Sequence, residues 1–244
     1  GVVDRKQTMP ILGHVLISGS SGEITITATD LEVQISSKFK ANISDDFTIT
    51  LPGRKLFDIL RSLGNTDIEL SSENEIAILK TEKSKFSLQQ LPANEFPLFD
   101  SAEGEQTFTI KQKDLSDIFN KTQFAMAQQD VRFYLNGLLL EISTETLNVV
   151  GTDGHRLAKT TSTLDKKNIS EQSCIVPRKA IQELTKSLSE SKECKVSLVD
   201  NQASFSYSQV TLTTKLIDGT FPDYNRVIPA ETTTNIMLDS KVLK

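Results

Sequence analysis

The strongest constraint on this 244-residue chain is an internal repeat. Four blocks recur in the same order, at an offset that grows from 123 to 125 residues. They are residues 10–17 with 133–140, residues 24–30 with 147–153, residues 51–55 with 176–179, and residues 91–97 with 216–222. Because fixed-period similarity is the signature of a duplicated structural unit, we expect two domains of the same topology.

The repeat also bears on the two ends of the chain. Residues 236–243 resemble residues 108–115, whereas the first copy has no counterpart of residues 108–123. We therefore expect a piece of a longer protein with at least three copies. Its domains would be 1–105 (lacking a first strand and helix), 106–233, and the start of a third at 234–244.

Each copy has a mixed helix and strand pattern. A strand at 107–110 leads into a helix from about Lys113, and a second helix follows Pro52 or Pro177, since proline favours the start of a helix. Segments with alternating apolar and polar residues, including 135–142 and 145–151, predict antiparallel strands. The fold class expected is α+β, with two helices packed on antiparallel sheets in each copy.

Composition excludes several classes of protein. No apolar run approaches the roughly 18 residues of a membrane-spanning helix, so we expect no membrane partner. The first residues do not read as a signal peptide, and only Cys174 and Cys194 are present. Two cysteines support neither a disulfide framework nor a zinc site, so we expect a cytoplasmic protein without a metal or other cofactor.

Few residues offer catalytic chemistry. His14 lies in an apolar strand pattern typical of a structural residue, and no nucleotide-binding or metalloprotease motif occurs. The segment Asp153-Gly154-His155-Arg156 predicts a turn that presents polar groups. Asp153 and His155 could serve a β-rich hydrolase, but Asp153 repeats as Asp30, which favours a shared turn former.

Basic residues open the second helix of both copies. Arg54-Lys55 and Arg178-Lys179 stand where the helix dipole disfavours positive charge, although the whole chain carries a net charge of −5. Phosphate groups would explain such pairs, because Lys and Arg neutralise phosphates without reading base sequence. A solvated helix surface is the alternative at this point.

Four motifs resemble a known family. Residues 152–158 (TDGHRLA), 129–137 (QDVRFYLNG), 176–179 (VPRK) and 218–224 (DGTFPDY) together resemble the bacterial DNA sliding clamp family, the β subunits of DNA polymerase III. The resemblance extends over the entire chain. It implies a non-catalytic homodimeric ring of three-domain subunits, a processivity factor that encircles double-stranded DNA without sequence preference. It also implies the DNA polymerase III α subunit, the clamp loader and other clamp-motif proteins as partners.

The resemblance further implies two sets of residues. The peptide-binding set lies in the second domain and comprises Leu135, Thr152, Gly154, His155, Arg156, Leu157, Pro222, Arg226 and Val227. The DNA-binding set comprises Lys6, Gln129, Phe133, Tyr134, Arg178 and Lys179, although the family often has arginine at Lys6 and tyrosine at Phe133. The alternatives are a two-domain β-rich hydrolase using Asp153 and His155, and a protein–protein scaffold that binds no DNA.

Overall fold

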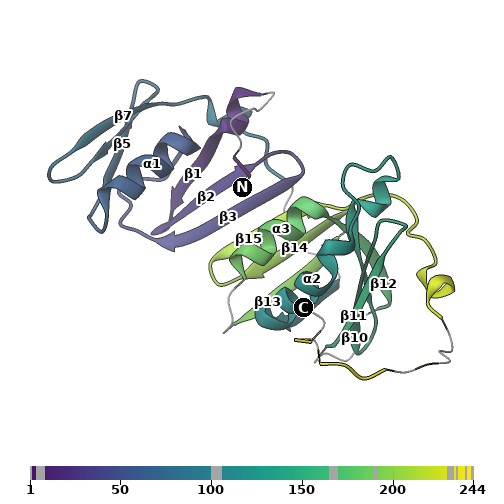
Figure 1. Cartoon of the computed structure of the whole chain (residues 1–244). Coiled ribbons are helices and arrows are strands. Elements are labelled where there is room, and N and C mark those ends of the chain that lie inside the picture. Colours follow the sequence, from purple (N-terminus) through teal and green to yellow (C-terminus); the bar gives the residue numbers. More distant parts are fainter. Residues whose placement is uncertain are drawn as a thin grey trace.

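The computed structural model of the protein describes residues 2–3, 9–99, 106–164, 170–188, 192–199, 201–229, 234, 236–239 and 241–242 (Figure 1). Lys6 lies outside these residues, and so do the residues at which we expect the domain boundaries, 105 and 233. Those boundaries remain predictions.

The first copy contains seven strands and one α-helix among its described residues. In chain order they are β1 (His14–Ser20), β2 (Glu23–Thr29), β3 (Val33–Lys40), β4 (Phe47–Pro52), α1 (Gly53–Leu63), β5 (Glu69–Glu73), β6 (Ile76–Lys80) and β7 (Lys85–Gln89). Short 3₁₀ turns lie at Pro10–Gly13 and Ala93–Glu95.

The second copy begins with an additional strand and helix. Its elements are β8 (Gln106–Lys111), α2 (Gln112–Thr122), β9 (Gly137–Ile142), β10 (Thr146–Thr152), β11 (Leu157–Thr163), β12 (Gln172–Pro177), α3 (Arg178–Ser187), β13 (Glu193–Val199), β14 (Gln202–Tyr207) and β15 (Val210–Lys215). Short 3₁₀ turns occur at Gln123–Ala125, Phe133–Leu135 and Tyr224–Val227.

The strand order is the same in both copies. Strands β4-β1-β2-β3 of the first copy correspond to β12-β9-β10-β11 of the second, and β5-β6-β7 correspond to β13-β14-β15. All these neighbouring strands pair antiparallel. The predicted α+β fold class is therefore confirmed.

The copies join through their sheets. Strand β3 pairs antiparallel with β15, with Ile35 opposite Leu212, and this pairing produces one sheet in the order β4-β1-β2-β3-β15-β14-β13-β8. Each of these two strands provides hydrogen-bond partners for backbone N–H and C=O groups of the other. These groups would be unpaired at an isolated sheet edge. The domain junction is therefore held by backbone hydrogen bonds that do not depend on side-chain identity.

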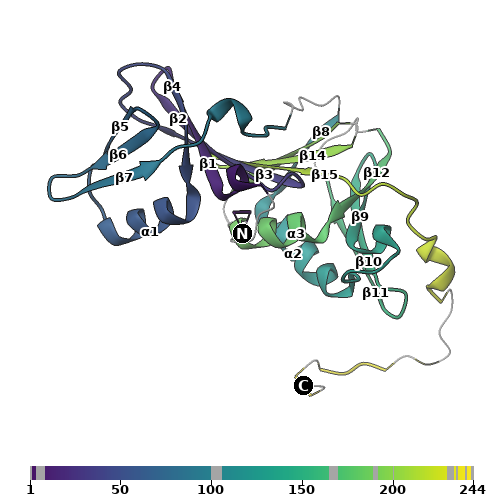
Figure 2. The same cartoon turned by 90° about the horizontal axis from the view of Figure 1, so that it is seen from above.

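The helices lie on one side of the sheets. Figure 2 shows α1, α2 and α3 on the same side of the eight-stranded sheet, and α2 contacts α3 directly. Helix α2 buries Leu115, Ile118 and Phe119, and α3 buries Ile181 and Leu184, against apolar residues of both sheets of the second copy. The i, i+3 spacing of these residues gives each helix one apolar face. Among the described residues, no helix is long and apolar enough to cross a membrane.

Two local predictions differ from the structure. The strand expected from residue 135 begins at Gly137, because Phe133–Leu135 form a 3₁₀ turn closed by the Asn136 amide donating to Phe133 O. Residues 236–239, which we expect to begin a third copy, form no strand and pair with no described strand, whereas the equivalent β8 pairs with β13.

Candidate functional site

The turn between β10 and β11, residues 152–156, is held by its own polar side chains. The Asp153 carboxylate accepts hydrogen bonds from the amides of His155 (2.9 Å) and Arg156 (3.0 Å). Thr152 Oγ1 accepts from the Gly154 amide and donates to Arg156 O. Gly154 has φ +88°, a conformation that glycine adopts at little cost. The sequence TDGHR thus fixes this turn locally.

The role of the Asp153 carboxylate follows from these contacts. Its Oδ2 also accepts a hydrogen bond from Arg156 Nε at 3.0 Å. The two backbone amides and the Arg156 side chain lower the pKa of Asp153, because they stabilise the ionised form. Both carboxylate oxygens therefore serve the turn, which is the turn-former interpretation of the repeat with Asp30.

A cavity of about 420 Å³ lies beside this turn. Its lining includes eight of the nine residues predicted to bind a peptide: Leu135, Thr152, Gly154, His155, Arg156, Leu157, Pro222 and Val227. The ninth, Arg226, is not part of the lining, and its Nε pairs with Asp223 Oδ2 at 3.0 Å. Apolar walls with a few polar groups suit a short peptide carrying apolar anchor side chains.

Four further residues line the cavity beyond the predicted set. They are Arg132, Tyr134, Asp223 and Tyr224. All four lie in the motifs that carry the family resemblance, so the signal was present in the sequence. Tyr134 was predicted to contact DNA, and its half-buried side chain packs against the buried cluster of Leu139, Val150, Ile175 and Tyr224.

The segment from Leu216 to Val227 forms one side of the cavity. Tyr224 is buried, with a relative exposure of 5%, and its hydroxyl donates to Glu141 Oε2. Burial, followed by this hydrogen bond to a carboxylate, raises the pKa of Tyr224 to about 12. Lys159 Nζ lies 4.8 Å from the centre of the Tyr224 ring. These contacts fix the segment against strands β9 and β11.

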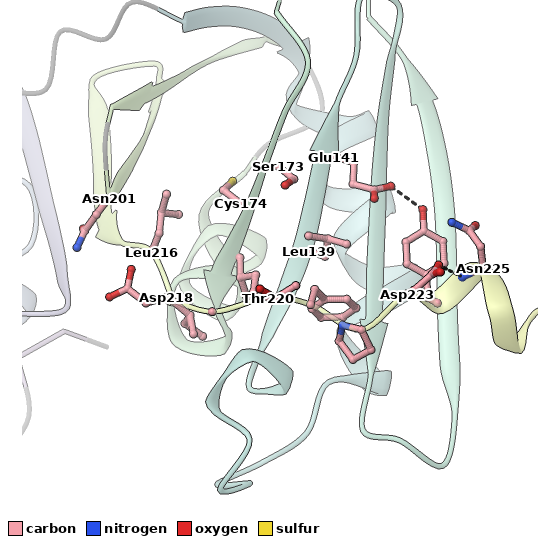
Figure 3. A pocket seen from close by; sticks show the side chains of 16 residues that line it. Leu139, Glu141, Ser173, Cys174, Asn201, Leu216, Asp218, Thr220, Asp223 and Asn225 are labelled. Atoms are coloured by element: carbon pink, nitrogen blue, oxygen red, sulfur yellow. Dashed lines mark hydrogen bonds between the residues drawn. The ribbon is translucent and has the colours of Figure 1, made fainter.

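The same segment borders a second, more polar cavity of about 460 Å³. Figure 3 shows its lining, in which Leu139, Glu141, Ser173 and Cys174 come from strands β9 and β12. Asp218, Thr220, Asp223 and Asn225 come from the segment that crosses these strands. Pro222, Asp223 and Tyr224 line both cavities, so one stretch of chain shapes both.

Residues 126–136, between α2 and β9, form a loop beside the first cavity. The Asp130 carboxylate binds Arg132 through two contacts, to Nε at 3.0 Å and to Nη2 at 2.9 Å. These Arg132 hydrogen bonds lower the pKa of Asp130 to about 2. Arg132 Nη2 also donates to Asp153 O at 3.3 Å, which links the loop to the turn at 152–156.

The described residues predicted to bind DNA come from two segments, the loop 126–136 and the start of α3. Gln129 and Phe133 are exposed in the loop 126–136, and Phe133 has a relative exposure of 71%. Arg178 and Lys179 open α3 and already contact other parts of the protein. Arg178 donates to Met126 O and Ala127 O, whereas Lys179 pairs with the buried carboxylate of Asp30 from the first copy.

The helices carry charge opposite to that of the whole chain. Helices α1, α2 and α3 together contain eight Lys or Arg residues and four Asp or Glu residues. The chain has 27 basic and 32 acidic residues. Because these helices lie on one side of the eight-stranded sheet (Figure 2), they bring net positive charge to that side, which would attract a polyanion.

Metal and thiol chemistry have little basis in the described residues. Within them, no group of three or more His, Cys, Asp or Glu side chains is placed to hold a metal ion. Burial raises the pKa of both Cys174 and Cys194 to about 12, so these thiols stay protonated at neutral pH. Burial also lowers the pKa of His14, which agrees with a neutral structural histidine.

Comparisons with known proteins agree on one family. Residues 109–223 match the family model of the DNA polymerase III beta subunit central domain, and residues 1–100 match the model of its N-terminal domain. The "Beta sliding clamp" of Pseudomonas putida is 42% identical over 233 residues, which cover 94% of this chain and 63% of the relative. That of Escherichia coli K12 is 38% identical over 232 residues, with the same coverage.

Solved structures agree with these sequence matches. The DNA polymerase III subunit beta of Pseudomonas aeruginosa superposes with a TM-score of 0.91 at 40% identity, over 95% of this chain and 64% of that one. A sliding clamp of the same organism bound to griselimycin gives a TM-score of 0.90 at 41% identity, over 96% of this chain and 64% of that one. The chain thus spans somewhat less than two thirds of the length of these relatives.

Proposed function

This chain belongs to the family of bacterial DNA polymerase III β subunits, the β sliding clamps, and from that membership we propose that its protein is a DNA sliding clamp. The complete protein encircles duplex DNA and tethers the replicative polymerase to it. It is a processivity factor in cytoplasmic DNA replication and catalyses no reaction itself; any polymerase activity belongs to its partners.

The charge of the helices is the observation that supports DNA binding best. Helices α1, α2 and α3 have excess Lys and Arg in an otherwise acidic chain. Contacts between such side chains and phosphates carry no sequence information, so the protein can slide. A closed ring needs only weak contacts of this kind, since topology prevents its escape.

Retention on circular DNA tests this proposal. The complete protein, loaded onto nicked circular duplex, should remain bound in gel filtration and leave when a restriction enzyme linearises the DNA. Direct binding to the helix face should weaken steeply with salt, because phosphate contacts release counterions. Equal retention on circular and linear DNA would contradict a topological link.

The first cavity supports the proposal that partner peptides dock on the second copy. Leu135, Leu157, Pro222 and Val227 provide apolar walls for anchor side chains. Its occupants would be short motifs of the polymerase III α subunit, the clamp loader and other clamp-binding proteins. We assign griselimycin, the ligand in the Pseudomonas aeruginosa clamp structure, to this cavity as well.

Assembly into a ring follows from the repeat. The β3–β15 pairing joins two copies through different surfaces, so it is a heterologous contact that can be repeated. In the described part of the chain, β11 and β7 lie at sheet edges, and they are the counterparts of β3 and β15. A third copy would pair with β11 and with β7 of the other subunit, which closes a homodimeric ring.

A further inference from the structure

Arg178 ties both ends of the loop 126–136 to the start of α3. Its guanidinium donates to Met126 O at 2.8 Å through Nη2 and to Ala127 O at 3.2 Å through Nε. Its backbone amide donates to Asn136 O at 3.0 Å. Arg178 therefore links the two ends of the loop. Two of its three hydrogen bonds come from the planar guanidinium group.

Within the loop, a chain of contacts leads from this closure to the cavity. Asn136 Oδ1 accepts from the Asp130 amide, and Asn136 Nδ2 donates to Asp130 O, each at 2.9 Å. The Asp130 carboxylate then holds Arg132. Arg132 lines the cavity and donates to Asp153 O in the turn 152–156. Each step is a hydrogen bond between described residues.

We propose that Arg178 is a positioning residue for the peptide cavity, an inference that rests on the proposed clamp function. It holds the loop so that Arg132 and Leu135 stand beside the turn 152–156, without itself lining the cavity. A phosphate contact at this position would need only positive charge. The positioning role needs two donors in one plane, which lysine does not have.

The decisive variant is Arg178→Lys in the complete protein, with griselimycin as the probe. Lysine keeps the charge but cannot bridge Met126 O and Ala127 O in the same way. Griselimycin affinity should fall about twofold to thirtyfold, the usual range for a residue that modulates binding without touching the ligand. Amide hydrogen exchange should accelerate in residues 127–136, while the amides of β13–β15 keep their protection.

Lys186→Met is the matched control. It removes a positive charge from the same helix, but the exposed Lys186 side chain pairs with Glu183 rather than with the loop. Griselimycin affinity and exchange in residues 127–136 should match the wild type in this variant. A drop as large as that of Arg178→Lys would overturn the proposal, because a change in α3 would then weaken binding without any contact to the loop.

Asp130→Asn tests the same proposal at a second position in the chain of contacts. This variant weakens the hold on Arg132 further along the chain of contacts and leaves Arg178 intact. Its loss of griselimycin affinity should not add to that of Arg178→Lys in the double variant, since both act through the loop. Full additivity, or wild-type affinity and exchange in Arg178→Lys, overturns the positioning role and leaves the clamp proposal intact. Failure of the wild type itself to bind griselimycin overturns the cavity assignment and with it this inference.

Discussion

The turns at residues 29–33 and 152–156 occupy equivalent places in the two copies, yet they serve different purposes. Asp30 accepts from the amides of Glu32 and Val33, as Asp153 accepts from those of His155 and Arg156. The Asp30 side chain is only 7% exposed and pairs with Lys179 of the other copy. The 152–156 turn instead borders a cavity.

The neighbouring copy accounts for the difference. In the first copy, Glu32 O accepts from the Lys215 amide and from Thr214 Oγ1, so strand β15 covers the turn. In the second copy, His155 and Arg156 stay exposed among the described residues. One local sequence pattern thus gives a domain junction where another copy packs against it, and an accessible site where none does.

The residue with positive φ also differs between the two turns. Leu31 has φ 76° and packs against the buried cluster of Ile11, Leu12, Leu16 and Phe96, so its apolar contacts offset a strain of about 1 kcal/mol. Its counterpart Gly154 carries no side chain, and a Cβ there would lie 3.2 Å from Arg132 Nη1. Glycine leaves room for the arginine that lines the cavity.

The largest effect should come from removing the two aspartates. Asp30→Ala should lower the free energy of unfolding by about 3 kcal/mol, because it leaves two amides and Lys179 without their buried acceptor. Asp153→Ala should lower the free energy of unfolding clearly less, because water can reach the groups that it leaves unpaired. Urea unfolding of both variants measures the difference. Equal losses of unfolding free energy would contradict the proposed difference between the two turns.

Binding should respond to a charge on the cavity wall. Leu157→Asp places an unpaired carboxylate among apolar walls, so griselimycin affinity of the complete protein should fall at least about tenfold, or roughly 1.4 kcal/mol. The counterpart in the first copy is Gln34, whose Oε1 accepts from the Phe99 amide. Gln34→Glu should leave griselimycin affinity unchanged in the same calorimetric titration. If Leu157→Asp also binds normally, the ligand site lies elsewhere.

Gly154→Ala should have a smaller effect on stability. A Cβ at φ +88° and close to Arg132 should destabilise the fold by about 1 kcal/mol. Gly13→Ala is the control, because a Cβ at Gly13 would have no atom within 4 Å and φ there is not positive. Its free energy of unfolding should change by less than about 0.5 kcal/mol. Similar values for both variants would remove the steric argument for glycine.

The smallest effect concerns pH. The pKa of Asp130 is lowered from 3.8 to about 2, so its contact with Arg132 should persist on acidification from neutral pH to pH 4. A lowered carboxyl pKa contributes stability above its ordinary value, and this stability is lost as pH falls through about 2. Carboxyl chemical shifts measured against pH should show this midpoint. A midpoint near 3.8 would mean that Arg132 does not hold the carboxylate in solution.

Local pattern determined much of this protein. The repeat predicted two domains of one topology, the prolines at 52 and 177 predicted the starts of α1 and α3, and the shared aspartates predicted turns. These features depend on residues close together in the chain, so sequence spacing alone encodes them. Most of the residues that line the cavity were predicted, because the family resemblance implied them.

Tertiary structure decided the contacts between distant segments. No pattern in the sequence predicts the ion pair of Lys179 with Asp30, or the hydrogen bonds from Arg178 to the carbonyls of Met126 and Ala127. Tyr134 lines the cavity because the segment 216–227 folds back across the sheet beside it. A charged or aromatic side chain can bind any suitable group within reach. Which group it meets depends on long-range strand pairing, above all β3 with β15, and no local pattern specifies that pairing.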